Sequence, residues 1–263
     1  MGEYSKTERD GHLFVITINR PEVYNALHPM ANQELSDAFD EFAGNPELWV
    51  AIITGAGDKA FSAGNDLKYH AEIRAKTGAR PVTPPKGFGG LTSRFDLDKP
   101  VIAAVNGVAM GGGFEIALAC DIIIASDRAK FALPEPRVGL AAAAGGMQRL
   151  SRQIPLKKAM GMMMTGRHVP AQEGFELGFV TAVVPHERLM LEARQWAQQI
   201  LECSPMSIRA TKQVVMRSLD VPGLELAARN LHYPAFDALT RSDDTIEGPK
   251  AFAEKRKPNW KGR

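Results

Sequence analysis

Cysteines, paired histidines and long apolar runs are all scarce in this chain of 263 residues. Its two cysteines, Cys120 and Cys203, are too few for a disulfide framework or a four-cysteine metal site. Its six histidines include no pair spaced i, i+4, so the sequence gives no support for a zinc site. No stretch approaches the ~20 strongly apolar residues that a membrane span requires. We therefore expect neither a metal nor a membrane.

The charges of the chain are nearly balanced. Lys and Arg number 32 and Asp and Glu 30, and the resulting net charge of +2 disfavours a dedicated nucleic-acid binder. Apolar residues make up 44% and charged residues 24%, which is usual for a folded globular protein. The N-terminus carries charges of both signs and no apolar segment, unlike a signal or transit peptide, so we expect a cytoplasmic protein.

Short apolar runs alternate with helical patterns through the first two thirds of the chain. The expected strands are 13–19, 49–54, 101–105 and 122–125, and an expected helix covers 29–43. This alternation predicts an α/β fold with repeated βαβ units. Residues 69–99, which are rich in Pro and Gly, are expected to form a long irregular loop or a short pair of helices.

The C-terminal part of the sequence lacks a strand pattern beyond about residue 186. Helices are expected instead over 188–203, 206–219, 224–239 and 243–255. The expected division of the chain is therefore an α/β core over residues 1–185 and a helical region over 186–263.

Two glycine-containing loops are candidates for binding an anion or a developing oxyanion. Gly111, Gly112 and Gly113 follow an expected strand and precede an expected helix, whose first N–H groups lack intrahelical partners. The alternative is a tight strand-to-helix crossing that needs no side chains. A second loop, 60–67, favours the oxyanion interpretation, because two such loops can each offer an amide to one oxygen. By contrast, residues 55–60 fit the dinucleotide pattern G-x-G-x-x-A only weakly, since no helix pattern follows.

Two glutamates accompany these loops. Glu115 lies in the first turn of the expected helix among apolar neighbours, where burial raises the pKa of a carboxyl. Glu135 stands between Pro134 and Pro136, which stiffen the chain around it. Each has an ordinary alternative role, as a helix-dipole partner and as a turn acid. Together with an amide pair they form a complete set for adding water across an activated double bond.

At these residues the sequence resembles the crotonase superfamily, and within it the enoyl-CoA hydratases. The resemblance covers essentially the whole chain and is carried by long ordered motifs at 60–68, 99–121, 131–140 and 145–150. The tail, 247–263, is most similar to that of carnitinyl-CoA dehydratase-like members. The resemblance implies a spiral α/β core of ββα units with a C-terminal helical trimerisation region. It also implies a homotrimer, often stacked into a hexamer.

The resemblance also implies roles for individual residues. The amides of Asn65 and Gly112 would hold the thioester oxygen, and Glu115 and Glu135 would be the catalytic carboxylates, with Glu115 as the base and Glu135 as the acid. The residues implied in CoA or substrate binding are Ala63, Gly64, Asp66, Leu67, Lys68, Gly111, Ala143, Phe252 and Lys255. The last two would reach the CoA of a neighbouring subunit. Coenzyme A would enter as part of the substrate, with no other cofactor and no metal.

The sequence departs from the family pattern after the second glutamate, where Ala142 and Ala143 replace the usual Pro-Gly. The amide of Ala143 would still be present to hold the attacking water, so the departure bears on the acyl group more than on the reaction. The alternatives are another crotonase-type reaction of an acyl-CoA, such as dehydration of a carnitinyl-CoA-like substrate, isomerisation or thioester hydrolysis. A more distant alternative is RNA binding through the basic tail 255–263 and its tryptophan.

Overall fold

Two β-sheets form the centre of the molecule in the computed structural model, which describes residues 2–78, 82–229 and 231–263. The larger sheet has the strand order β1-β2-β3-β5-β7-β10, with β1 antiparallel to β2 and all other pairs parallel. Its strands are β1 (Ser5–Asp10), β2 (Leu13–Ile18), β3 (Val50–Gly55), β5 (Val101–Val105), β7 (Ile122–Ser126) and β10 (Ala182–Val184). The α/β prediction is thus confirmed.

The central strands of the larger sheet, β2, β3, β5 and β7, are buried on both faces because their alternate side chains are apolar in both directions. In β2, Phe14 and Ile16 face a core shared with α1 (Pro29–Gly44) and α3 (Gly112–Ala119). Leu13 and Val15 face a second core, which is closed by α7 (Leu189–Leu201) through its buried residues. These layers explain the continuous apolar runs in the sequence.

The smaller sheet has the order β4-β6-β8-β9, and its first three strands are parallel. The strands are β4 (Ala60–Ser62), β6 (Val108–Met110), β8 (Lys130–Ala132) and β9 (Val169–Pro170). Since β4, β6 and β8 are adjacent and parallel, the segments that follow them leave from the same edge of the sheet. Those segments contain Gly64, Gly111 and Glu135.

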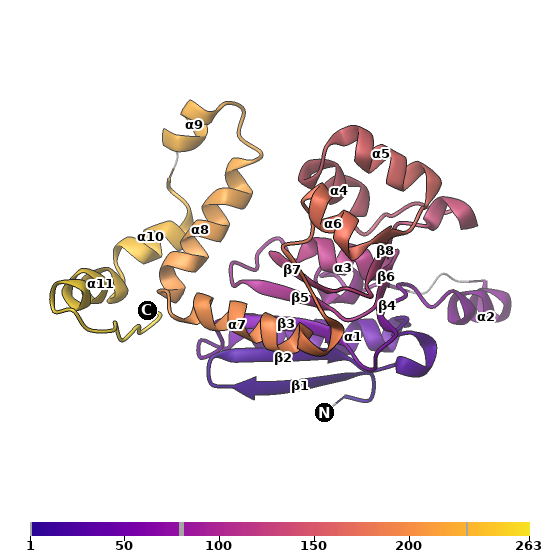
Figure 1. The fold of residues 1–263 in the computed structure, drawn as a ribbon, viewed down its shortest axis with the longest axis horizontal. Helices are drawn as coiled ribbons and strands as arrows, with labels where there is room; N and C mark the ends of the chain where they lie inside the picture. Colours follow the sequence, from indigo (N-terminus) through magenta and orange to yellow (C-terminus); the bar gives the residue numbers. More distant parts are fainter. Residues whose placement is uncertain (1, 79–81, 230) are drawn as a thin grey trace.

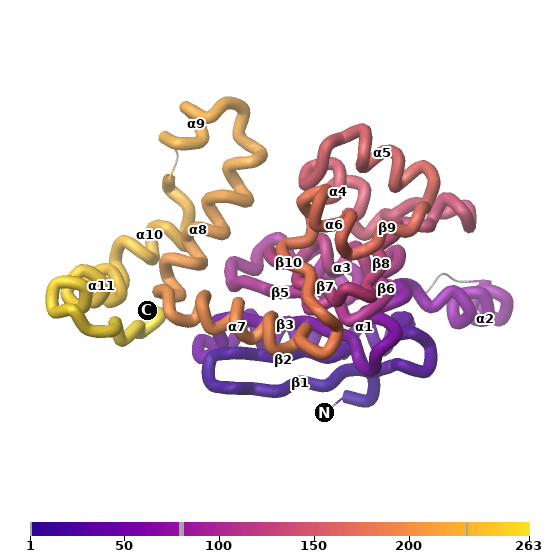
Figure 2. Tube along the Cα trace, in the orientation of Figure 1, coloured from indigo at the N-terminus to yellow at the C-terminus, as the bar shows by residue number. Residues whose placement is uncertain are grey.

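The remaining helices surround the sheets or extend from them. They are η1 (Pro21–Val23), α2 (Leu67–Thr77), η2 (Phe88–Gly90), η3 (Glu135–Val138), α4 (Gly146–Gln153), α5 (Leu156–Thr165), α6 (Ala171–Leu177), η4 (His186–Arg188), α8 (Pro205–Ser218), α9 (Leu224–Arg229), α10 (Pro234–Thr240) and α11 (Asp244–Ala253). Helices α8 to α11 project away from the sheets on the side of the molecule opposite to α2 (Figures 1 and 2). We call residues 205–263 the C-terminal arm.

Most predicted elements are present, and three differences have physical causes. The single helix expected over 224–239 is wrong: α9 ends at Arg229 and α10 begins at Pro234, whose ring holds Tyr233 in an extended conformation. Strand β1 was missed because its exposed residues are charged. The smaller sheet was missed because its strands are only two or three residues long. Residues 69–99 contain α2 and η2, and Pro81 lies outside the described residues.

Within the described residues, no helix is both long enough and apolar enough to cross a membrane.

Candidate active site

The two glycine-containing loops meet at the edge of the smaller sheet. Gly64 has a left-handed backbone (φ +84), and a Cβ built on it would lie 2.5 Å from the carbonyl oxygen of Met110 and 2.8 Å from the backbone nitrogen of Gly112. Any side chain at residue 64 would therefore separate the loops. The two loops thus meet, as expected, although the strands that lead to them are β4 and β6 rather than the predicted ones.

The backbone at this junction leaves two N–H groups available. Leu27 and Asn65 form a parallel bridge in which the N–H of Leu27 donates to Gly64 (2.8 Å) and the N–H of Asp66 donates to Leu27 (3.1 Å). The N–H of Asn65 is not used by this bridge. Gly112 is the first residue of α3, where the N–H has no intrahelical acceptor and the helix dipole is positive. The pair can therefore stabilise an oxyanion.

Glu115 lies one helical turn beyond this amide pair and is only 3% exposed. Its Oε1 accepts a hydrogen bond from the backbone N–H of Gly146 (2.8 Å). Burial raises the pKa of Glu115 to about 7; the charge of Glu135 adds to the rise, and the N–H of Gly146 opposes it. At neutral pH this carboxyl can take up or release a proton, as a general acid or base must.

Glu135 begins η3, the short helix that follows β8, and a proline flanks it on each side. Its carboxyl lies against the second glycine loop, since a Cβ built on Gly111 would be 2.9 Å from Glu135 Oε1. Its Oε2 is shielded from solvent and has no hydrogen-bond partner within the described residues. Burial raises the pKa of this carboxyl as well. An unpartnered buried oxygen beside the amide pair is available to a substrate or to water.

Phe88 and Arg149 also lie at this junction, and Arg149 was not predicted as a site residue. The ring of Phe88 occupies the space where a side chain at Gly112 would stand. Arg149, in α4, lies near Glu115, and its guanidinium donates to the carbonyls of Thr92 and Ala144. The sequence contained one signal for Arg149, its place in the family-like motif 145–150, but neither its partners nor its burial follow from that motif.

The expected CoA-binding segment leads from β4 into α2. Asp66 is the N-cap of α2, where its Oδ1 accepts from the N–H of Tyr69 (3.1 Å) and its Oδ2 pairs with Arg20 (3.0 Å). Its side chain thus holds the loop in place. Leu67 and Lys68 are exposed on the first turn of α2, and Ala63 is half-buried. The structure therefore gathers the expected residues 63–68 on one accessible edge.

The remaining expected contacts are dispersed. Ala143 is exposed just before the turn that binds Glu115. Phe252 is 86% exposed on α11, and Lys255 follows it with a left-handed backbone (φ 54). Both belong to the C-terminal arm, on the side of the molecule opposite to α2 (Figure 1). They cannot meet the CoA-binding segment of their own chain, so their expected role requires a neighbouring subunit.

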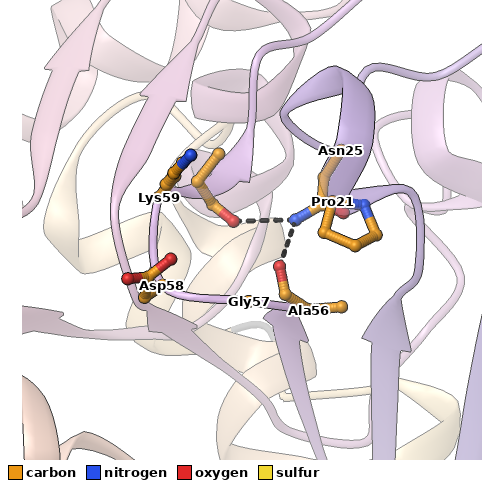
Figure 3. A pocket seen from close by; sticks show the side chains of 7 residues that line it. Pro21, Asn25, Ala56, Gly57, Asp58 and Lys59 are labelled. Atoms are coloured by element: carbon orange, nitrogen blue, oxygen red, sulfur yellow. Dashed lines mark hydrogen bonds between the residues drawn. The ribbon is translucent and has the colours of Figure 1, made fainter.

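A cleft of about 200 Å³ lies beside the Arg20–Leu27 turn, and it contains neither Glu115 nor Glu135. Asn25 occupies its wall and donates to the carbonyl oxygens of Ala56 (3.0 Å) and Ala60 (2.8 Å) (Figure 3). These bonds fix the turn against the start of β4. We assign this cleft a structural role, because the side-chain amide of Asn25 in its wall already has backbone partners on both its nitrogen and its oxygen.

Within the described residues, no group of three or more His, Cys, Asp and Glu side chains is arranged to hold a metal ion. The junction presents two carboxyls, Glu115 and Glu135, and the backbone amides of Asn65 and Gly112.

The sequence and the structure are both similar to those of known proteins. The sequence model of the enoyl-CoA hydratase/isomerase family matches residues 8–263. Carnitinyl-CoA dehydratases of Citrobacter koseri and of Escherichia coli strain K12 are each 45% identical to this chain, with 100% of both chains covered. The crystal structure of an enoyl-CoA hydratase from Mycobacterium tuberculosis H37Rv superposes with a TM-score of 0.91 at 35% identity, again with 100% of both chains covered. An enoyl-CoA hydratase from Mycobacterium marinum gives 0.91 at 34% identity, with the same coverage.

Proposed function

Because the chain belongs to the enoyl-CoA hydratase/isomerase family and has the crotonase fold, we propose that Glu115 and Glu135 catalyse the reversible addition of water to a 2-enoyl-CoA thioester. The enzyme is a hydro-lyase that forms or consumes a 3-hydroxyacyl-CoA. One observation carries the assignment of residues: the amides of Asn65 and Gly112, the buried Glu115 and the unpartnered oxygen of Glu135 lie around one junction of two loops.

The proposed reaction consists of two proton transfers and one bond to oxygen. The thioester oxygen accepts from the N–H groups of Asn65 and Gly112, which stabilise the enolate that forms when water attacks the β-carbon. Ionised Glu115 takes the proton that this water loses, and protonated Glu135 gives a proton to the α-carbon. A proton then returns from Glu115 to Glu135 through solvent before the next turnover. Dehydration uses the same steps in reverse.

The hydrogen-bond partners of the two carboxyls, rather than their pKa values, support this division of roles. Glu115 accepts a backbone hydrogen bond, which favours its ionised form, and its pKa of about 7 leaves it partly ionised at neutral pH. Glu135 has a raised pKa and an oxygen without a protein partner, as suits a carboxyl that carries the proton it delivers. Glu115 and Glu135 account for both proton transfers of the reaction. We therefore propose that coenzyme A enters only as part of the substrate.

We propose that the acyl group is that of carnitinyl-CoA or a close analogue. The support is the 45% identity to carnitinyl-CoA dehydratases over the full length of both chains, which exceeds the identity to the enoyl-CoA hydratases named above. Carnitinyl-CoA is itself a 3-hydroxyacyl thioester, so its dehydration needs no further group.

A panel of acyl-CoA substrates tests both proposals. Hydration of crotonyl-CoA and longer enoyl-CoAs is followed by the loss of the enoyl thioester absorbance, and dehydration of carnitinyl-CoA by its gain. We expect the highest kcat/KM with carnitinyl-CoA or its dehydration product. A preference for crotonyl-CoA would overturn the acyl assignment. No hydration or dehydration of any substrate, with cleavage or isomerisation of another CoA ester, would overturn the reaction.

We also propose that the protein is a homotrimer or a dimer of trimers assembled through the C-terminal arm. In support, the arm exposes large apolar side chains on α8 and α9, namely Val215, Met216, Leu219, Leu224 and Leu226. A trimer would bring Phe252 and Lys255 to a neighbour's CoA-binding segment. Sedimentation velocity distinguishes the states, and a monomer at micromolar concentration would contradict this proposal.

A further inference from the structure

Arg149 places a largely buried guanidinium between two segments of the active site. It donates to the carbonyl oxygen of Thr92 (2.8 Å) and, through its other terminal nitrogen, to that of Ala144 (3.4 Å). The guanidinium carbon also lies 5.5 Å from the centre of the Phe95 ring. Burying an arginine is costly unless several groups receive its charge. The arrangement therefore points to a purpose beyond covering the surface of α4.

One of these carbonyls belongs to the turn that holds Glu115. Ala144 directly precedes Gly145 and Gly146, and the N–H of Gly146 donates to Glu115 Oε1 (2.8 Å). Gly145 has a left-handed backbone (φ +98), and a side chain on it would collide with the terminal nitrogen of Arg149. The turn thus has no side chain where the guanidinium lies.

The other carbonyl belongs to the segment beside the oxyanion amide. The N–H of Phe88 donates to Thr92 Oγ1 (2.8 Å), and the Phe88 ring packs against Gly112. A single guanidinium consequently connects the support of the catalytic carboxyl to the support of the amide, although Thr92 and Arg149 are 57 residues apart in sequence.

We propose that Arg149 is a positioning residue that holds Glu115 and the amide of Gly112 in register through the Ala144 and Thr92 carbonyls. This inference rests on the proposed function, in which both groups act on the same substrate. Arg149 itself does not reach the reacting atoms; it acts through the Gly146 turn and through Phe88.

The charge of Arg149 also acts on Glu115. The ionisable groups that influence this carboxyl are Glu135 of η3, which raises its pKa, and Arg149 of α4, which lowers it. Arg149 also interacts with Cys120, a buried thiol whose pKa is raised by burial, so it stays neutral. Removing the guanidinium therefore raises the pKa of Glu115, and the acid limb of the pH–kcat profile moves to higher pH.

Three variants test the proposal. In Arg149→Met, kcat falls by about 10- to 100-fold because the Ala144 and Thr92 carbonyls are no longer held by one guanidinium. KM changes little, and the acid limb of the pH–kcat profile moves to higher pH. In Arg149→Lys, the limb stays near its wild-type position because the charge remains. Its kcat still falls, because one ammonium cannot span both carbonyls as the planar fork does. The matched control is Arg152→Met on the same helix, since exposed Arg152 donates to the carbonyl of Gln148 within α4 and to no other described residue. It retains wild-type kcat.

Wild-type kcat in Arg149→Lys, or an unmoved acid limb in a folded Arg149→Met, would overturn the proposal. If Arg149→Met does not fold, the kcat of Arg149→Lys alone tests the proposal, which predicts a value below that of the wild type. A titration of the ¹³C-labelled carboxyl of Glu115 in substrate-free protein separates this inference from the proposed function. Its pKa should rise in Arg149→Met but not in Arg152→Met, whether or not the enzyme hydrates enoyl thioesters. An unchanged pKa would contradict the proposed action of Arg149 on Glu115.

Discussion

The α3 region and the η3 region each present one glutamate to the same loop junction, yet they hold it in different ways. Glu115 is carried by a regular helix, is 3% exposed, and receives a hydrogen bond from Gly146. Glu135 begins a short helix, stands between two prolines, and keeps one buried oxygen without a partner within the described residues. Two side chains of the same type thus differ in how much of their hydrogen-bonding capacity the protein uses.

This difference teaches how one site can contain both a base and an acid. Burial raises the pKa of both carboxyls, and at the more deeply buried Glu115 the pKa reaches about 7. The N–H of Gly146 and the charge of Arg149 act on Glu115 and favour its ionised form. Glu135 Oε2 has no protein partner within the described residues, so this carboxyl is available to contact the substrate.

Removing the ionisable group from the α3 region should have the largest effect. Glu115→Gln keeps the acceptor for Gly146 but cannot take a proton from water, so we expect kcat to fall by about 10³- to 10⁴-fold. Steady-state kinetics with the preferred acyl-CoA measure this. Glu176→Gln, at an exposed site on α6, is the matched control and should be unchanged. If Glu115→Gln retained more than a tenth of the wild-type kcat, Glu115 would not be the base.

The corresponding change in the η3 region should be somewhat smaller. In Glu135→Gln, we expect a fall in kcat of about 10²- to 10³-fold, because solvent can supply the α-proton inefficiently. The Kd of a CoA product, measured by calorimetry, should change little, since the CoA-binding segment 63–68 does not include Glu135. An effect confined to Kd, with kcat preserved, would show that Glu135 binds substrate without transferring a proton.

The third prediction concerns stability. The folded pKa of Glu115, about 7, is above the ordinary value of 4.5, so the folded protein binds the extra proton. This contribution is fully present below about pH 4.5 and is lost as the pH rises through 7, a loss of about 3 kcal/mol. Glu115→Gln has no carboxyl at this position, so its stability does not include this pH-dependent contribution. The variant should therefore gain stability relative to wild type between pH 5 and pH 8 in urea unfolding. If the free energy of unfolding of Glu115→Gln differed from that of the wild type by the same amount at pH 5 and at pH 8, the raised pKa would be contradicted.

The smallest expected effect comes from the turn that supports Glu115. A Cβ on Gly146 would lie 2.9 Å from Glu115 Cγ and 3.0 Å from its Oε1. Gly146→Ala should displace the carboxyl by a few tenths of an ångström and lower kcat by about tenfold. Gly161→Ala is the control, because a Cβ there meets nothing within 4 Å. Equal activity of the two variants would show that the turn does not position Glu115.

The sequence predicted the two glutamates and the two loops but not the arrangement that joins them. Glu115 and Glu135 stood out because an acid among apolar residues and an acid between prolines are unusual locally. The smaller sheet could not be predicted, because Ala60–Ser62 is too short to show an alternating pattern. The hydrogen bond from the guanidinium of Arg149 to the carbonyl oxygen of Thr92 could not be predicted either, because it depends on where two distant segments of the chain meet. The break between α9 and α10 could have been predicted from Pro234, at which α10 begins.

The most direct test of the account is exchange of the α-proton of a saturated acyl-CoA in D₂O, followed by NMR in the two glutamine variants. This step needs only the amide pair and the carboxyl that faces the α-carbon. In the proposed reaction that carboxyl is Glu135, so exchange should persist in Glu115→Gln and be lost in Glu135→Gln. Exchange that persists in Glu135→Gln and disappears in Glu115→Gln would contradict the assignment.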